Sequence, residues 1–177
     1  MTMLGTFGFS YIGLFYLLML WIPNGLWARR LPEGYDPSGE NELLLILERV
    51  GQVMCTASIL LFTDYNPQTL EPWTAWFIAS AELMILYEVF WIRYFRSRRT
   101  MRDFYRPLFG VPAPGATFPV VAFLLLGVYG KVTWLIAASV ILGVGHIGIH
   151  FQHFANLKKK EDIAGLCIPR HRTDESA

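Results

Sequence analysis

The stretch VTWLIAASVILGVGHIGIHFQHF, residues 132–154, contains no Asp, Glu, Lys or Arg. A hydrocarbon core of about 30 Å is crossed by about 20 mostly apolar helical residues. The stretch therefore predicts a transmembrane helix. It also carries His146, His150 and His153, and polar side chains at membrane depth are costly unless they face protein or water.

Four further apolar stretches precede it, which makes five predicted spans: residues 7–27, 43–62, 73–95, 118–130 and 132–154. The fourth is the shortest and begins beside Pro119. Gly130 and Lys131 separate it from the fifth, so we expect the last two spans to form a tight helical hairpin. The alternative is one kinked helix of about 37 residues, which is too long for a single crossing without extreme tilt.

The composition agrees with a membrane protein. Hydrophobic residues make up 54% of the chain, charged residues 16%, and the mean hydropathy is +0.37, whereas soluble domains carry about 25% charged residues. The formal net charge of +1 excludes a nucleic-acid-binding polyelectrolyte. Cys55 and Cys167 offer neither a disulfide framework nor a zinc-binding spacing.

Lysine and arginine are distributed very unevenly. Thirteen of the 15 follow the first, third or fifth span, Lys131 lies between the fourth and fifth, and Arg49 lies within the second. By the positive-inside rule, five spans then place the N-terminus outside and the C-terminus in the cytoplasm. Because Arg29 and Arg30 follow the first span, we expect it to be a retained anchor and not a signal peptide.

The connections are too short to hold a soluble domain. We expect one transmembrane domain, residues 1–156, and a polar, mobile cytoplasmic tail, residues 157–177. Residues 31–41 are predicted to be a turn-rich connector, with Ser38 as the N-cap of the second span. Residues 109–119 fit either an ordinary loop or a re-entrant segment. The six tryptophans fall near span ends, as in aromatic belts.

Three spans carry ionisable or amide side chains. Glu48, Arg49 and Gln52 lie in the second, Glu82 and Glu88 in the third, and three histidines in the fifth. At 1.5 Å per residue, Glu48, Glu88 and His146 lie about 8, 10 and 12 Å from the cytoplasmic boundary. We therefore expect ionisable groups from three helices to meet at one level.

Helical spacing groups these residues into stripes. Glu48, Gln52 and Cys55 share one face of the second span. Ser139 and Gly143 share a face of the fifth span with its three histidines, and small residues permit close approach of a neighbouring helix. Glu82 and Arg93 share a face of the third span, while Glu88 points elsewhere.

Other interpretations of these polar groups stay open. Glu48 or Glu88 would form a purely structural ion pair with Arg49 or Arg93. Alternatively, His146 and His150, four residues apart, would hold zinc or iron together with a carboxylate. We favour neither, and we predict no cofactor and no bound metal. The arginines between 93 and 106 are typical of a stop-transfer signal, or of a lipid-headgroup site.

The sequence thus predicts an all-α, five-span membrane bundle with a buried Glu/Arg/His site near the cytoplasmic leaflet that binds or converts a lipid-like or amphipathic molecule. Candidate catalytic residues are Glu48, Glu88, His146 and His150. Candidate ligand-binding residues are Arg49, Gln52, Glu82, Arg93 and His153. The alternatives are a proton- or cation-coupled transporter or channel subunit and a non-catalytic accessory subunit. Expected partners are membrane lipids, a lipid-like ligand and a second copy of the chain, but no nucleic acid, and the expected location is a bacterial cytoplasmic membrane.

Overall fold

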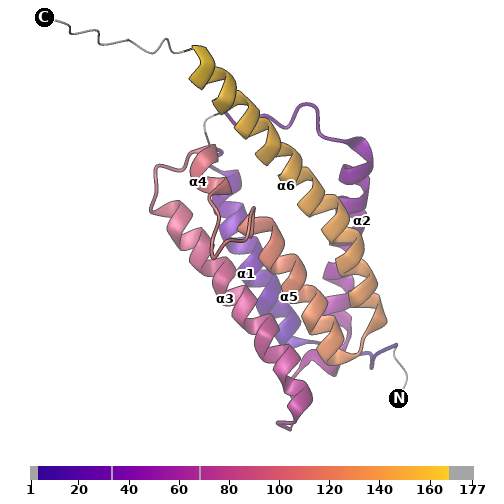
Figure 1. Ribbon diagram of the computed structural model, residues 1–177. Coiled ribbons are helices and arrows are strands. Elements are labelled where there is room, and N and C mark those ends of the chain that lie inside the picture. Colours follow the sequence, from indigo (N-terminus) through magenta and orange to yellow (C-terminus); the bar gives the residue numbers. More distant parts are fainter. Residues whose placement is uncertain (1–3, 33, 68, 168–177) are drawn as a thin grey trace, which may run out of the picture.

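The computed structural model describes residues 4–32, 34–67 and 69–167. These residues form an all-helical bundle, and no strand occurs among them (Figure 1). The α-helices are α1 (Tyr11–Ala28), α2 (Glu42–Leu61), α3 (Ala75–Phe95), α4 (Met101–Tyr105), α5 (Pro114–Gly130) and α6 (Thr133–Cys167). Two short 3₁₀ helices, η1 (Thr63–Tyr65) and η2 (Pro72–Thr74), lie between α2 and α3.

The helices have the dimensions and composition of membrane spans. Four are long and apolar enough to cross a bilayer: Tyr11–Ala28, Glu42–Leu61, Pro72–Phe95 and Thr133–Lys160. The fifth apolar helix, α5, has 17 residues. The fold is therefore consistent with a multi-pass membrane protein of four to five spans.

The expected hairpin between α5 and α6 is present. Lys131 adopts a left-handed conformation with φ of 54° and ends α5. The Val132 amide then donates to the Gly127 carbonyl at 3.0 Å, a hydrogen bond typical of helix C-termini. The chain reverses within this turn, so the single long helix is excluded.

Several helix boundaries differ from the expected ones. Asn41, not Ser38, caps α2, because its side chain accepts hydrogen bonds from the Leu43 and Leu44 amides. Helix α5 begins at Pro114, a position where proline's missing N–H costs nothing, so residues 114–119 are helical and Pro119 lies within the helix. Helix α6 continues through Lys158–Lys160 to Cys167, since lysine is a good helix former. Of the expected polar tail, residues 168–177 lie outside the described part.

Small residues bring α2 and α6 into close contact. A Cβ atom at Gly51 would overlap the backbone of Leu142, and one at Gly145 would overlap the backbone of Glu48 and Leu44. Ser139, which we expected at this seam, is buried there, and its hydroxyl lies 3.9 Å from the Cys55 sulfur. The inward-facing polar residues of α2 and α6 are therefore held side by side.

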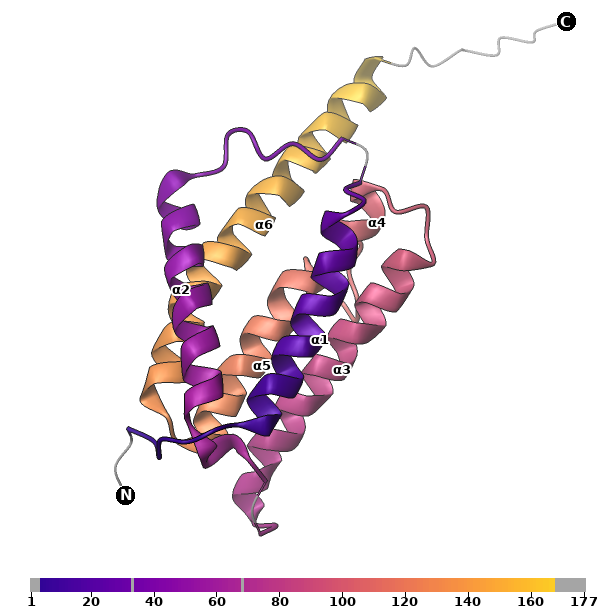
Figure 2. The same ribbon diagram turned by 180° about the vertical axis from the view of Figure 1, so that it is seen from behind.

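Helix α1 touches α2 at one end only. Near the start of α1 the Gly8 and Ser10 amides donate to carbonyls at the end of α2. Further along, α1 is bonded to α3: the Tyr16 hydroxyl lies 3.2 Å from the Ser80 hydroxyl, and Asn24 donates to the Tyr87 hydroxyl. Helices α1 and α2 therefore diverge toward the C-terminal end of α1, and Figure 2 shows this side of the bundle.

The C-terminal half of α3 and the short helix α4 form an aromatic cluster. Trp91 packs against Phe90, Tyr94 and Phe104, with ring centroids 5.1–6.0 Å apart. Trp91 is buried, so it is not the interfacial anchor that its position near a span end suggested. This packing places α4 beside α6.

Candidate functional site

Two neighbouring cavities lie inside the bundle. The larger has a volume of about 750 Å³ and the smaller about 350 Å³. Asn24, Gln52, Gly115 and His146 line both cavities. The two cavities therefore adjoin one another.

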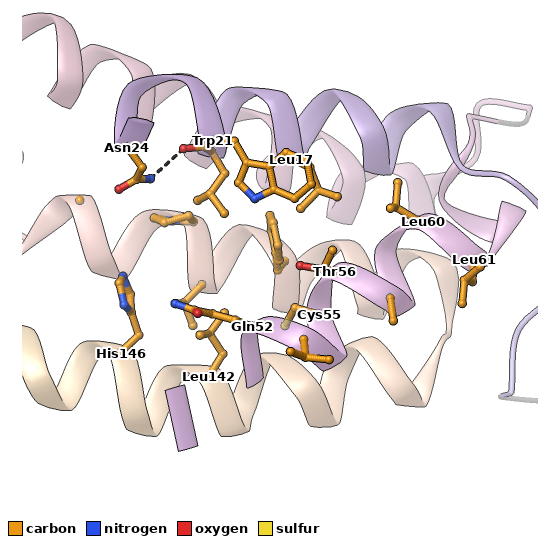
Figure 3. Close-up of a pocket in the computed structure, with 17 residues that line it drawn as sticks. Leu17, Trp21, Asn24, Gln52, Cys55, Thr56, Leu60, Leu61, Leu142 and His146 are labelled. Atoms are coloured by element: carbon orange, nitrogen blue, oxygen red, sulfur yellow. Dashed lines mark hydrogen bonds between the residues drawn. The ribbon is translucent and has the colours of Figure 1, made fainter. Parts of the chain in front are cut away.

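The larger cavity is apolar and lies where α1 and α2 diverge. Leucines 17 and 20 and Trp21 line it from α1, while Cys55 and Thr56 line it from α2 (Figure 3). Helix α5 closes its back with Pro119, Val120 and Phe123. Such a volume and lining are typical of pockets for small apolar molecules.

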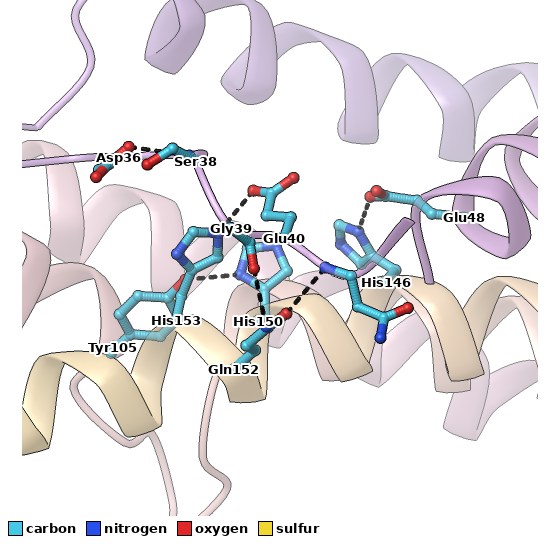
Figure 4. Close-up of polar contacts among 11 residues, drawn as sticks. Asp36, Ser38, Gly39, Glu40, Glu48, Tyr105, His146, His150, Gln152 and His153 are labelled. Atoms are coloured by element: carbon cyan, nitrogen blue, oxygen red, sulfur yellow. Dashed lines mark hydrogen bonds and ion pairs between the residues drawn. The ribbon is translucent and has the colours of Figure 1, made fainter. Parts of the chain in front are cut away.

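Glu48 and His146 stand where the apolar cavity meets the polar one. The His146 Nδ1 atom lies 2.5 Å from the Glu48 Oε1 atom (Figure 4). The Gln52 amide donates to the same oxygen at 3.3 Å. The carboxylate accepts the Nδ1–H hydrogen bond and so fixes the orientation of the imidazole. The Nε2 atom of His146 then remains for exchange of a proton or a hydrogen bond with a molecule in the cavity.

A second histidine extends this polar row. The rings of His146 and His150 are 4.6 Å apart between centroids, and the Tyr105 hydroxyl lies 3.1 Å from the His150 Nδ1 atom. Tyr105 comes from α4, which the aromatic cluster holds against α6. Burial raises the pKa of the Tyr105 phenol, so this hydroxyl keeps its proton at neutral pH and serves as a neutral hydrogen-bonding partner.

The connection between α1 and α2 closes the polar cavity on the side of the third histidine. The His153 Nε2 atom lies 2.7 Å from the Glu40 Oε1 atom. The Gln152 amide donates to the Gly39 carbonyl at 3.1 Å and accepts from the Asn41 amide at 3.3 Å. Residues 39–41 therefore cross α6 as a fixed strap.

Tyr35 lies on this connection and faces both carboxylates. Its ring centroid is 5.7 Å from that of His153. Burial, and then the negative charges of Glu40 and Glu48, raise the pKa of the Tyr35 phenol. The ring therefore lies in a region of negative potential.

The cavities bring six of the nine predicted site residues together. Glu48, Arg49, Gln52, His146, His150 and His153 all line the polar cavity. They come from α2 and α6 alone. The expected convergence of three spans is thus present for two of them.

The three residues predicted from α3 do not line either cavity. Glu82 is exposed on the outer surface. Glu88 is half-buried, and its Oε1 atom has no hydrogen-bond partner among the described residues. Arg93 donates to the carbonyls of Pro107 and Arg106 at 2.8 and 2.5 Å, so it fixes the loop before α5. The structure does not bring them to the cavities, because the buried side chains of α3 are instead those of Tyr87, Phe90 and Trp91.

Three site residues were missed by sequence reasoning: Tyr35, Glu40 and Tyr105. Tyr35 and Glu40 lie in a segment rich in proline and glycine that reads as a plain connector. Tyr105 follows a run of arginines, where an aromatic residue is typical of a membrane interface. Only the fold-back of both segments onto α6 shows their role.

The expected burial of charge is only partial. No Asp, Glu, Lys or Arg among the described residues is fully buried. The side chains of Glu48 and His146 are 18% and 24% exposed, and those of Glu40 and His153 are 13% and 11% exposed. Of the residues considered for a structural arginine–glutamate pair, Glu48 contacts His146 and Arg93 donates to backbone carbonyls. In the described part of the chain, no three His, Cys, Asp or Glu side chains are arranged to hold a metal ion.

Comparison with known proteins gives no family for the chain: no protein-family model, no curated protein and no solved structure matches it.

Proposed function

We propose that the protein binds an amphipathic, lipid-like molecule within a membrane, with the apolar part between α1 and α2 and the polar end at Glu48 and His146. The observation that carries this proposal is the shared lining: the apolar and polar cavities meet at His146 and Gln52. A molecule that fills both volumes has one apolar end and one polar end. That is the definition of an amphiphile.

The side between α1 and α2 gives such a molecule a route of entry. The outward-facing residues beside the apolar cavity include Trp21, Val53 and Leu61, and all three are exposed apolar side chains. Exposed apolar surface of this kind is stable against acyl chains and costly in water. We propose that the ligand enters from the bilayer and not from the aqueous phase.

The orientation follows from the basic residues. The ends of α1 and α3 and the C-terminal part of α6 lie at the same end of the bundle (Figure 1). In our proposal this end, with the polar cavity beside it, faces the cytoplasm. The head of the ligand then lies in the cytoplasmic half of the membrane.

The chemistry at the head is proton exchange. Glu48 holds the Nδ1 atom of His146, which leaves Nε2 as a base toward the cavity. An enzymatic version of the proposal uses this atom to move a proton on the bound amphiphile. A binding protein uses it as a hydrogen-bond acceptor.

The row Glu48, His146, His150 and Tyr105 also favours a second candidate, proton-coupled transport. Its contacts of 2.5 Å, 4.6 Å between ring centroids and 3.1 Å form a relay of groups that can pass a proton. Proton flux into proteoliposomes that depends on His150 would support transport. Equal proton flux in wild type and His150→Gln would rule out proton-coupled transport through this row.

Ligand binding is tested with a variant whose larger side chain fills the apolar cavity. Thr56 projects into it from α2 (Figure 3), so Thr56→Trp occupies the space of the acyl chain. Ile46 is exposed on the same helix and lines neither cavity, so Ile46→Trp is the matched control. Native mass spectrometry then counts the lipids retained by each purified protein. We expect retention in wild type and Ile46→Trp and loss in Thr56→Trp. Equal retention in both variants contradicts the proposal.

A further inference from the structure

The polar cavity is lined by carboxylates and by aromatic rings. Two of its residues are carboxylates, Glu40 and Glu48, and five are aromatic: Trp27, Tyr35, Trp91, Phe104 and Tyr105. Carboxylates beside aromatic faces are the usual surroundings of an ammonium ion in proteins, because the ring quadrupole attracts a cation. A phosphate or a second carboxylate is repelled by both.

The aromatic rings stand at steep angles to one another. Trp27 and Tyr35 are 5.2 Å apart with an interplanar angle of 83°, and Phe104 and Tyr105 are 5.2 Å apart at 87°. Trp27 also lies 5.6 Å from Phe104. Rings from α1, the connection after it and α4 thus pack together and give the polar cavity an aromatic lining, a surface that attracts cations.

The charges of the same cavity favour a cation. Besides three histidines, the cavity is lined by the carboxylates of Glu40 and Glu48 and by the Arg49 guanidinium. Arg49 is exposed at the protein surface, whereas Glu40 and Glu48 are only 13% and 18% exposed. The two carboxylates are therefore the charges held within the protein, where the attraction between charges is stronger than in water. The balance is therefore negative where the aromatic rings lie.

Both carboxylates keep an oxygen for a ligand. The hydrogen bonds that Glu40 and Glu48 make with His153, His146 and Gln52 all use the Oε1 atom of the carboxylate. Among the described residues nothing donates to the Oε2 atom of either side chain. Each carboxylate therefore has one oxygen available to a cation in the cavity.

We infer that the head of the bound amphiphile carries an ammonium group, held in the polar cavity by the aromatic rings of Trp27, Tyr35 and Phe104 and by the carboxylates of Glu40 and Glu48. The inference rests on the proposed function, because it names the head of the molecule whose tail occupies the apolar cavity. The polar cavity of about 350 Å³ has the volume of about twelve waters at about 30 Å³ each. It is large enough for a trimethylammonium or ethanolammonium group.

The test uses three amphiphiles with one common tail: hexadecyltrimethylammonium, hexadecyl phosphate and hexadecyl maltoside. The protein is held in nanodiscs of phosphatidylglycerol, whose lipids carry no ammonium group, and native mass spectrometry measures the binding of each probe. We expect the ammonium probe to bind at least tenfold more tightly than the other two. Equal binding of all three, or preference for the phosphate or the maltoside, overturns the ammonium inference and leaves the proposed function standing. Binding of none of them contradicts the proposed function itself.

Variants separate the site from simple attraction of a cation to an anionic membrane. Glu40→Gln/Glu48→Gln keeps an oxygen to accept each histidine hydrogen bond but removes both charges. We expect it to reduce the preference for ammonium at least tenfold, and Trp27→Leu to reduce it several-fold. Glu42→Gln removes an exposed carboxylate that lines neither cavity and is expected to leave the preference intact. An equal loss in Glu42→Gln and the double variant would show that the preference comes from the membrane surface.

Discussion

At the scale of single residues, the proposed ligand site depends on the contact between Glu48 and His146. Their atoms are 2.5 Å apart, and about a fifth of each side chain is exposed. Fully buried pairs cost about 3–5 kcal/mol when one partner is removed. This pair is partly solvated, so its loss is expected to cost less.

Glu48→Gln is expected to lower stability by no more than about 1 kcal/mol, because the amide oxygen still accepts the Nδ1–H of His146 while a charged hydrogen bond becomes a neutral one. Glu48→Leu leaves the imidazole without that partner and is expected to cost about 1–3 kcal/mol. Thermal unfolding in detergent measures both, with Glu42→Gln as the exposed control. Equal stability of the Gln and Leu variants would show that the contact does not hold the imidazole.

Tyr105 gives a second test at this scale. Tyr105→Phe removes the hydroxyl that lies 3.1 Å from the His150 Nδ1 atom and leaves the ring packing in place. Loss of one partner of a buried polar group costs about 1–3 kcal/mol. Tyr11→Phe removes an exposed hydroxyl and is expected to change nothing. A Tyr105→Phe variant that unfolds at the same temperature as wild type and Tyr11→Phe would contradict the prediction.

At the scale of elements, α2 and α6 are the pair that carries the site. Gly145 is in contact with the backbone of Glu48 and Leu44, so the position of the polar residues on both helices depends on it. A side chain at this point forces the helices apart.

Gly145→Ala is expected to destabilise the bundle by about 1–3 kcal/mol, the usual cost of overpacking, and to weaken ligand retention. Gly25 in α1 has no heavy atom within 4 Å of the position of a Cβ. Gly25→Ala is therefore expected to leave stability unchanged or to raise it by about 0.5–1 kcal/mol, since alanine favours helix. Thermal melts of the two variants make the comparison, and a Gly145→Ala protein as stable as wild type would contradict the packing of α2 on α6.

The sequence predicted the helices better than it predicted the residues of the candidate site. Hydrophobic length located α2 and α3 to within two residues at each end, because long apolar runs have one stable conformation in a membrane. The 4-3-4 spacing also placed Glu48 and Gln52 on one face, opposite the histidines of α6. Helical spacing could not predict the contacts of segments that fold back onto the helices.

Glu40 and Tyr105 show why. Each lies in a short polar segment whose course is set by tertiary packing and not by periodicity. Glu88 and Arg93 do not line the cavities, because position along a helix does not give the direction in which a side chain points. Facing direction on α3 is decided by its aromatic residues, which fill the interior.

At the scale of the whole molecule, the ends of the bundle differ in charge. The connection of residues 62–72 holds no lysine or arginine, whereas the opposite end holds the arginines that follow α1 and α3. By the positive-inside rule, we expect the basic end to face the cytoplasm.

Single cysteines introduced into a variant without Cys55 and Cys167 test this orientation in intact cells. Thr69→Cys, an exposed position between η1 and η2, is expected to react with a membrane-impermeant maleimide. Ser38→Cys, exposed in the connection after α1, is expected to react only after the membrane is opened. The reverse pattern would invert the orientation and place the head of the ligand in the outer half of the membrane.

The central claim is that one amphiphile occupies both cavities, and an experimental density map of the protein in lipid nanodiscs tests it most directly. We predict a continuous, elongated density that begins between α1 and α2, passes Thr56 and Gln52, and ends beside Glu48 and His146. A map in which α1 packs against α2 along its whole length, or in which the space beside His146 is filled by the protein's own side chains, would contradict the account.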